Sequence, residues 1–217
     1  MKKNNIFLSA ILIFACVFML TACGSVESKT NYMVLVNKES KLPENWEETI
    51  ELVDVYTGLD QTYQVEKKTA EAYEKLREDL EKDHIIIELD STYRTVKTQQ
   101  EIWDEFEKEK GIEYAKKYVA VPGTSEHHTG LAIDVKIVKD GKIIDDNDDM
   151  TAEKEIFSKI HAKLAKYGFI LRYPVGKENI TGYGSEVWHF RYIDNEEIAK
   201  EIMDKGLTLE EYLKNNE

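Results

Sequence analysis

The sequence predicts a single α+β domain with an antiparallel sheet and helices packed around it. Segments with apolar residues at helical spacing are interspersed with short apolar or alternating segments typical of strands. Asp140-Gly141 lies between two of these short segments and is a strong two-residue hairpin signal, so the strands that it joins are antiparallel. The 217 residues, 42% of them hydrophobic, are enough for one core, and they contain no repeat.

The first 22 residues are typical of a secretory signal, so we expect them to lie outside the domain. Lys2 and Lys3 precede an apolar run over residues 6–20. This run of about fifteen residues is short for a membrane span, which needs about 20. Small residues followed by Cys23 are typical of a bacterial lipoprotein signal, whose cysteine is lipidated after cleavage. A plain signal peptide or a retained helix is the alternative.

We therefore divide the chain into a signal (1–22), a lipidated Cys23 with a short polar tether (23–31) and a folded domain (32–217). Loss of the signal changes the formal net charge from −13 to −15, because it removes two lysines and no acidic residue. Such a charge excludes nucleic acid as a partner and excludes electrostatic docking on anionic lipid. The mature domain has no thiol for a disulfide or a nucleophile. We expect the protein to be a monomer. We expect its lipid to anchor it to the cell membrane, outside the cytoplasm.

The first half of the domain is expected to contain two long helices. Helical spacing over 66–83 precedes a buried strand over 85–87. The second helix begins near Thr95 or Thr98, and Glu101, three residues after Thr98, resembles a capping box. The positions of the first helix that face the core are Thr69, Tyr73, Leu76 and Leu80. A strand, a loop that leads into an ill-defined stretch, and a short helix after Gly111 complete this half (residues 32–37, 42–46 and 112–118).

The second half is expected to hold the central strand, which runs from Leu131 to Val138 and returns through a hairpin to residues 142–144. Thr151 caps a helix that Gly168 ends. Asp194 and Thr208, each followed three residues later by Glu, cap two terminal helices. Two further strands are expected over 169–173 and 187–193.

Candidate metal ligands lie on the central strand and on the last strand. Apolar residues alternate along the central strand, so Asp134 points to the opposite, open face of the sheet. His127 reaches the same place if Thr129-Gly130 turns the chain, and His189 lies on the later strand. Two histidines and one aspartate form a three-ligand zinc set that leaves a fourth position for water.

The other histidines are assigned on weaker grounds. Spacing alone does not decide whether His127 or His128 is the ligand. His84 at a helix end and His161 within a charged helix are expected to be solvated or satisfied structural residues.

Two further side chains suit the chemistry of such a site. Glu186 precedes His189 by three residues, so both face one site only if the strand bends between them. A carboxylate that does not bind the metal is the usual general base beside a zinc-bound water, whereas the alternative is an exposed loop acid. Arg94 lies in a Ser/Thr/Tyr-rich loop, where a guanidinium can grip a carboxylate or steady an oxyanion, and Gln99 can add a neutral hydrogen bond.

Five motifs in order resemble the VanY-type D-alanyl-D-alanine carboxypeptidases, which share a metallopeptidase family with lysostaphin-like enzymes and the hedgehog fold. The resemblance covers roughly residues 32–193. It consists of Tyr93-Arg94-Thr95-x-x-x-Gln99, Ser125-x-His127-x-x-Gly130-x-Ala132-x-Asp134, Arg172-Tyr173-Pro174, Thr181-Gly182-Tyr183 and Glu186-x-Trp188-His189. Thr95 departs from the serine that is commoner in the family, although it keeps the hydroxyl.

This resemblance implies a role for each residue of the motifs. It implies zinc bound by His127, Asp134 and His189, and it favours His127 because His128 falls on a variable position. It implies Glu186 as catalytic base and Arg94 as the group that polarises the scissile carbonyl or steadies the oxyanion. It also implies that Gln99 and Ser125 lie near the terminal carboxylate of the substrate, with Tyr93 as a further substrate-binding residue.

The implied function is a lipid-anchored zinc carboxypeptidase that removes the terminal D-alanine from peptidoglycan stem peptides. An L,D-carboxypeptidase that cuts the tetrapeptide stem is the nearest alternative. A dipeptidase acting on free D-Ala-D-Ala suits an anchored protein less well, because that substrate is cytoplasmic. A non-catalytic, zinc-containing wall-binding module is the alternative from another class, and it would have no need of Glu186.

Overall fold

The computed structural model describes residues 30–58 and 61–216 of the chain. The signal over 1–22, Cys23 and almost all of the tether over 23–31 lie outside the described residues, so the expectations about them stay predictions. Among the described residues, no helix has the length and apolar character needed to cross a membrane.

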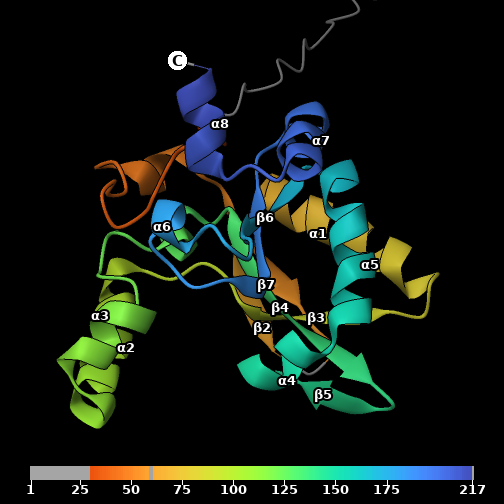
Figure 1. Cartoon of the computed structure of the whole chain (residues 1–217), viewed down its shortest axis with the longest axis horizontal. Helices are drawn as coiled ribbons and strands as arrows, with labels where there is room; N and C mark the ends of the chain where they lie inside the picture. The colour runs from red at the N-terminus through yellow and green to blue at the C-terminus, as the bar shows by residue number, and fades with distance from the viewer. Residues whose placement is uncertain (1–29, 59–60, 217) are drawn as a thin grey trace, which may run out of the picture.

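A five-stranded antiparallel sheet forms the centre of the domain, which confirms the predicted fold class (Figure 1). Its strand order is β3-β4-β7-β6, and β5 pairs with the C-terminal end of β4. The strands are β3 (Ile86–Ser91), β4 (Ala132–Lys139), β5 (Lys142–Ile144), β6 (Phe169–Tyr173) and β7 (Glu186–Tyr192). The turn between β4 and β5 has positive φ at Asp140 and Gly141, as the predicted hairpin requires.

Helices cover the two faces of this sheet unequally (Figure 1). On one side lie α1 (Lys67–Glu81), α5 (Lys154–Leu164) and α7 (Glu196–Lys205). On the other side, α2 (Val96–Lys110) and α3 (Ile112–Tyr118) stand away from the sheet. The sheet therefore has one face that is packed and one that is open for a site.

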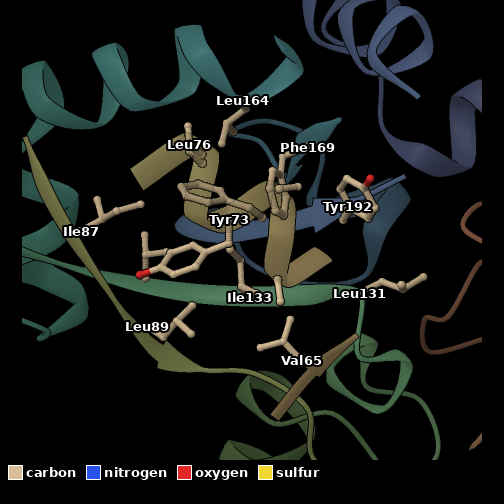
Figure 2. Close-up of a cluster of buried hydrophobic side chains, with 14 of the residues drawn as sticks. Val65, Tyr73, Leu76, Ile87, Leu89, Leu131, Ile133, Leu164, Phe169 and Tyr192 are labelled. Atoms are coloured by element: carbon tan, nitrogen blue, oxygen red, sulfur yellow. The ribbon is translucent and has the colours of Figure 1, made fainter. Parts of the chain in front are cut away.

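The main core lies between the sheet and the helices of the packed side (Figure 2). The four core positions predicted for α1 are confirmed, because Thr69, Tyr73, Leu76 and Leu80 are at most 1% exposed. Leu131, directly before β4, and Ile133 and Val135 within it are fully buried in the same core. Asp134 therefore points to the opposite face, as the alternation predicted.

The ill-defined stretch after residue 46 contains a second, two-stranded sheet that the sequence did not predict. A 3-10 helix (Trp46–Thr49) leads into β1 (Leu52–Tyr56), which pairs with β2 (Thr62–Glu66). Val55, Val65 and Glu66 are the buried members, and the other side chains in the pair are exposed or half-buried. The weak apolar pattern explains why this hairpin was missed.

Several predicted helix starts are wrong by a few residues. The Thr95 alternative for α2 is correct, because its side chain accepts a hydrogen bond from Thr98 N at 3.0 Å; Thr98 and Glu101 lie inside the helix. Thr151 does not cap a helix, because it lies within a separate short helix, and α7 is capped by Asn195 rather than Asp194. The remaining helices are α4 (Asn147–Ala152), capped by Asp146, a 3-10 helix (Ala165–Tyr167) that ends at Gly168 as predicted, α6 (Glu178–Thr181) and α8 (Leu209–Asn215), which has the predicted Thr208–Glu211 capping box.

The strand predicted over 32–37 is also wrong. Two carbonyl oxygens of this segment, those of Tyr32 and Val34, accept hydrogen bonds from Arg191 Nη2 at 2.9 and 2.8 Å. Asn37 then turns the chain, because its side-chain oxygen accepts from the backbone N–H groups of Glu39 and Ser40. A guanidinium therefore takes the place of a neighbouring strand.

The strand predicted over 85–87 is confirmed, but at the sheet edge Ile86 is 43% exposed.

A fully buried carboxylate, Glu126, joins several of these elements. It begins a 3-10 helix (Glu126–Thr129), and its Oε1 accepts hydrogen bonds from Arg172 Nε at 2.7 Å and Arg191 Nη1 at 2.8 Å. Arg172 also binds both carboxylate oxygens of Glu210 in α8. Burial by itself would raise the pKa of Glu126, but the two arginines outweigh it and hold that pKa well below its usual range.

Replacing Glu126 with glutamine should destabilise the protein strongly, because two buried guanidinium groups then lose the charge that they share. We expect the free energy of unfolding, measured in urea, to fall by about 3–5 kcal/mol. Glu105→Gln, on an exposed position of α2, is the matched control and should change it by less than about 0.5 kcal/mol.

A comparison of the wild type with Glu126→Gln at different pH values tests whether the carboxyl group of Glu126 is charged. A depressed folded-state pKa stabilises the protein above the ordinary glutamate pKa, and this contribution is lost as the pH falls. Between about pH 5 and pH 3 the wild type should therefore lose stability more steeply than Glu126→Gln, by up to about 1.4 kcal/mol per pH unit. Parallel pH dependences for the two proteins would contradict the assigned charge.

Candidate active site

Three predicted ligands meet on the open face of the sheet. Asp134 on β4 and His189 on β7 are paired in register, and Gly130, with φ 71°, turns the chain so that His127 reaches the same place. One ligand atom from each residue lies within 4.8 Å of the others. His127 Nε2 is 3.1 Å from Asp134 Oδ2, and His189 Nδ1 is 2.8 Å from Asp134 Oδ1.

The donor set fits a metal ion better than it fits a hydrogen-bonded cluster. Asp134 Oδ1 is buried and has no hydrogen-bond partner among the described residues, although His189 Nδ1 lies only 2.8 Å away. The two atoms are thus close together without the alignment of a hydrogen bond. Two imidazole nitrogens and one carboxylate oxygen form the open three-ligand set that zinc accepts.

Outer contacts orient each imidazole for this role. His127 Nδ1 lies 2.8 Å from the carbonyl oxygen of Thr92, so it donates there and leaves Nε2 free for the site. His189 Nε2 lies 3.3 Å from Glu126 Oε2, which leaves Nδ1 for the site. Glu126 was not among the predicted site residues. The available signal was one arginine within each of two predicted strands, at positions 172 and 191, because buried cations need a nearby anion.

The two imidazoles differ in their affinity for a proton. Burial lowers the pKa of His127 to about 4, so its ring is neutral at physiological pH. Burial acts in the same direction on His189, but the charge of Asp134 outweighs it and raises that pKa to about 10. A metal ion bound here therefore replaces a proton on His189.

The remaining histidines lie outside this group. His128 bridges two loops, because its Nδ1 donates to the carbonyl oxygen of Arg94 at 2.7 Å and its Nε2 accepts from Gly123 N at 3.1 Å. The structure thus places His127, and not His128, among the candidate ligands. His84 and His161 are not part of the group, and His161 has the satisfied contact expected of a structural residue.

Glu186 reaches the same site because β7 is irregular. The pairing of β6 with β7 shifts between Leu171 and Tyr173, which supplies the bend that the sequence required. Glu186 Oε2 lies 3.6 Å from His189 Nδ1. Burial raises the pKa of Glu186 to about 7, since the neighbouring His189 lowers it by less.

Arg94 and Gln99 form a hydrogen-bonded pair at the side of the site. Arg94 Nη1 donates to Gln99 Oε1 at 3.0 Å, and Gln99 Nε2 donates to the carbonyl oxygen of Ala120 at 2.9 Å. Arg94 Nε is buried and finds no hydrogen-bond partner in the part of the chain that the structure describes. Burial lowers the pKa of Arg94, while the carboxylates of Asp134 and Glu186 act in the opposite direction.

A cleft of roughly 330 Å³ collects these groups in one place. Ser125 lines it, and its Oγ accepts a hydrogen bond from His127 N at 3.3 Å. Tyr93 does not line it, because its hydroxyl donates to Glu47 at 2.8 Å. The predicted site residues in the lining are Arg94, Gln99, Ser125, His127, Asp134, Glu186 and His189.

Comparison with known proteins gives a consistent picture. The family model described as "VanY: D-alanyl-D-alanine carboxypeptidase" matches residues 62–195. The bifunctional D-Ala-D-Ala dipeptidase and D-Ala-D-Ala carboxypeptidase VanXYC of Enterococcus gallinarum is 39% identical over 186 residues, which are 84% of this chain and 93% of that protein.

Two solved structures extend the likeness to the fold. A mutant of the vancomycin-resistance D,D-pentapeptidase VanY in complex with Zn(II) has a TM-score of 0.70 at 32% identity, covering 84% of this chain and 98% of the other. The LD-carboxypeptidase LdcB has a TM-score of 0.73 at 37% identity, covering 85% and 86%. The chain therefore belongs to the VanY family of D-alanyl-D-alanine carboxypeptidases.

Proposed function

We propose that this protein is a zinc carboxypeptidase that removes the C-terminal D-alanine from peptidoglycan stem peptides. The observation that carries the proposal is a cleft in which a three-ligand set and a separate, half-buried carboxylate, that of Glu186, stand side by side. Family membership and the Zn(II) complex of a related VanY support it. A wall-binding module would need no such carboxylate.

His127, Asp134 and His189 would hold the zinc ion. When bound, zinc supplies a Lewis acid that lowers the pKa of a water molecule towards about 7 and stabilises negative charge on oxygen. Glu186 accepts a proton from the attacking water and passes it to the amine of the leaving D-alanine. Its pKa of about 7 suits both transfers, because a base and its conjugate acid are then both available near neutral pH.

The other residues of the cleft would hold the substrate. Arg94 lines the cleft, and its positive charge would polarise the scissile carbonyl or stabilise the oxyanion that forms from it. Ser125 would contact the terminal carboxylate. Both polar atoms of the Gln99 side chain already have protein partners, which favours a role in holding Arg94. The contact of Tyr93 with Glu47 leaves its predicted substrate contact without support.

The two candidate activities differ in the bond that they cleave. The description of the family model and the name of VanXYC favour cleavage between two D-alanines. The likeness to the LD-carboxypeptidase LdcB favours the L,D-carboxypeptidase as the second candidate. The ligand set does not distinguish them, because the difference lies in the pocket for the residue before the scissile bond.

Release of free D-alanine by purified residues 24–217 tests the proposed function. We expect chelator-sensitive release from a stem pentapeptide ending in D-Ala-D-Ala, with the reaction stopping at the tetrapeptide. Release from the tetrapeptide would move the assignment to the L,D-activity. Zinc-loaded protein that releases nothing from either peptide would contradict an enzymatic role.

Replacing Glu186 with glutamine separates catalysis from metal binding. We expect turnover of the pentapeptide to fall by about 10²–10⁴-fold, because the water loses its proton acceptor. The zinc content, measured by atomic absorption, should stay at the wild-type level. Glu105→Gln is the control for loss of an exposed carboxylate that does not line the cleft. A Glu186→Gln protein with near wild-type turnover would show that another group is the base.

Action on the cell wall places the protein outside the cytoplasm, and we propose that a lipid on Cys23 holds it at the membrane as a monomer. The charged and apolar segments before Cys23 support this proposal. Cys23→Ser should shift the protein from the membrane fraction to the medium, and the intact mass of the membrane-extracted wild type should include the lipid. An unmodified Cys23 in that mass would refute the anchor.

A further inference from the structure

The irregular pairing of β7 determines how Glu186 reaches the cleft. Between the pairs Leu171–Phe190 and Tyr173–Glu186, β6 advances by two residues and β7 by four. The additional residues of β7 therefore lie between Glu186 and Phe190, and pairing with β4 covers β7 only from His189 onward. Bulges of this kind redirect side chains beside active sites.

Val187 lies in this bulge, and the registers of β7 with β6 and β4 assign it no partner residue. Its carbonyl oxygen lies 2.8 Å from Nε2 of His161, a residue of α5. A carbonyl oxygen can only accept, so Nε2 carries the hydrogen and donates it. A helix from the packed side of the sheet thus supplies a hydrogen bond that the neighbouring strands do not provide.

The imidazole of His161 is itself held between two aromatic rings. Its centroid lies 5.9 Å from the ring of Phe157 in α5 and 5.9 Å from the ring of Phe190 in β7, with the second pair at 90°. The contact with Phe157 is tilted at 47° and the contact with Phe190 is edge-on, so both rings restrict the orientation of the imidazole. An apolar side chain of similar size would satisfy the same packing, so the N–H group serves the carbonyl oxygen alone.

We propose that His161 is a positioning residue for the carboxylate of Glu186, and that it acts through the carbonyl group of Val187. Val187 directly follows Glu186, so a fixed carbonyl group limits backbone rotation beside the proposed base. This inference rests on the role of Glu186 in the proposed function. A displacement of about 1 Å in a catalytic group can cost about 100-fold in rate.

The test compares two substitutions of His161 in the zinc-loaded protein. His161→Leu keeps the packing and removes the donor, whereas His161→Gln retains an N–H group near the place of Nε2. We expect His161→Leu to lower kcat for the pentapeptide by about 10- to 100-fold with KM changed by less than about twofold. His161→Gln should restore most of kcat. Both variants should keep the wild-type zinc content.

Hydrogen exchange supplies a readout that is independent of activity. The backbone amides from Glu186 to His189 should exchange faster in His161→Leu than in the wild type or in His161→Gln. Leu164→Ala is the matched control, because it creates a cavity in the same helix at a fully buried position facing the main core. It should lower the urea midpoint and leave kcat within about twofold of the wild type.

Each outcome decides the matter. An unchanged kcat in His161→Leu, an equal loss in His161→Gln, or an equal loss in Leu164→Ala would overturn the positioning role. If the wild type is active and Glu186→Gln is not, these results leave the proposed function standing. A wild-type protein that releases no D-alanine, or a fully active Glu186→Gln, would overturn the proposed function and this inference together.

Discussion

The carboxylate of Glu126, buried between Arg172 and Arg191, is the interaction on which the rest of the structure depends. Its second oxygen faces His189, so one group both neutralises two buried cations and orients a candidate ligand. Removing any one member of this arrangement is strongly destabilising, because its partner would remain as a buried charge without compensation. With Glu210 included, two carboxylates balance two guanidinium groups, and the cluster is neutral as a whole.

Two carboxyl groups in the cleft have pKa values shifted in opposite directions, because their surroundings differ. Asp134 faces two imidazoles, which outweigh the effect of burial and keep its pKa below the usual range. In Glu186, burial prevails and raises the pKa to about 7. One acid thus stays charged at all physiological pH values, as a metal ligand must, and the other can exchange a proton. The bend in β7 makes this difference possible, because it brings Glu186 to the cavity that His189 also faces, although residues three apart on a regular strand point to opposite faces.

Local patterns predicted the parts of the fold whose partners are near in sequence or repeat with a clear period. The core positions of α1, the hairpin after β4 and the direction of Asp134 are examples. The segment 32–37 was mistaken for a strand because its hydrogen-bond partner, Arg191, lies more than 150 residues away. Glu126 was missed for a related reason: nothing beside it in the sequence indicates that two arginines from separate strands converge on it. The motifs therefore pointed to the three candidate ligands that the structure brings together, but not to the side chains that hold them.

The cluster of Glu126, Arg172, Arg191 and Glu210 also determines how much of the chain a stable fragment must contain. The family model ends at residue 195 and begins at residue 62, and every proposed ligand and the proposed base lie within that span. Yet Arg191 donates to carbonyl oxygens at residues 32 and 34, and Arg172 donates to Glu210. A fragment trimmed to the matched span would keep each motif and strip acceptors from both buried cations. The functional unit therefore extends on both sides beyond the span that the family model matches, because its buried charges have partners there.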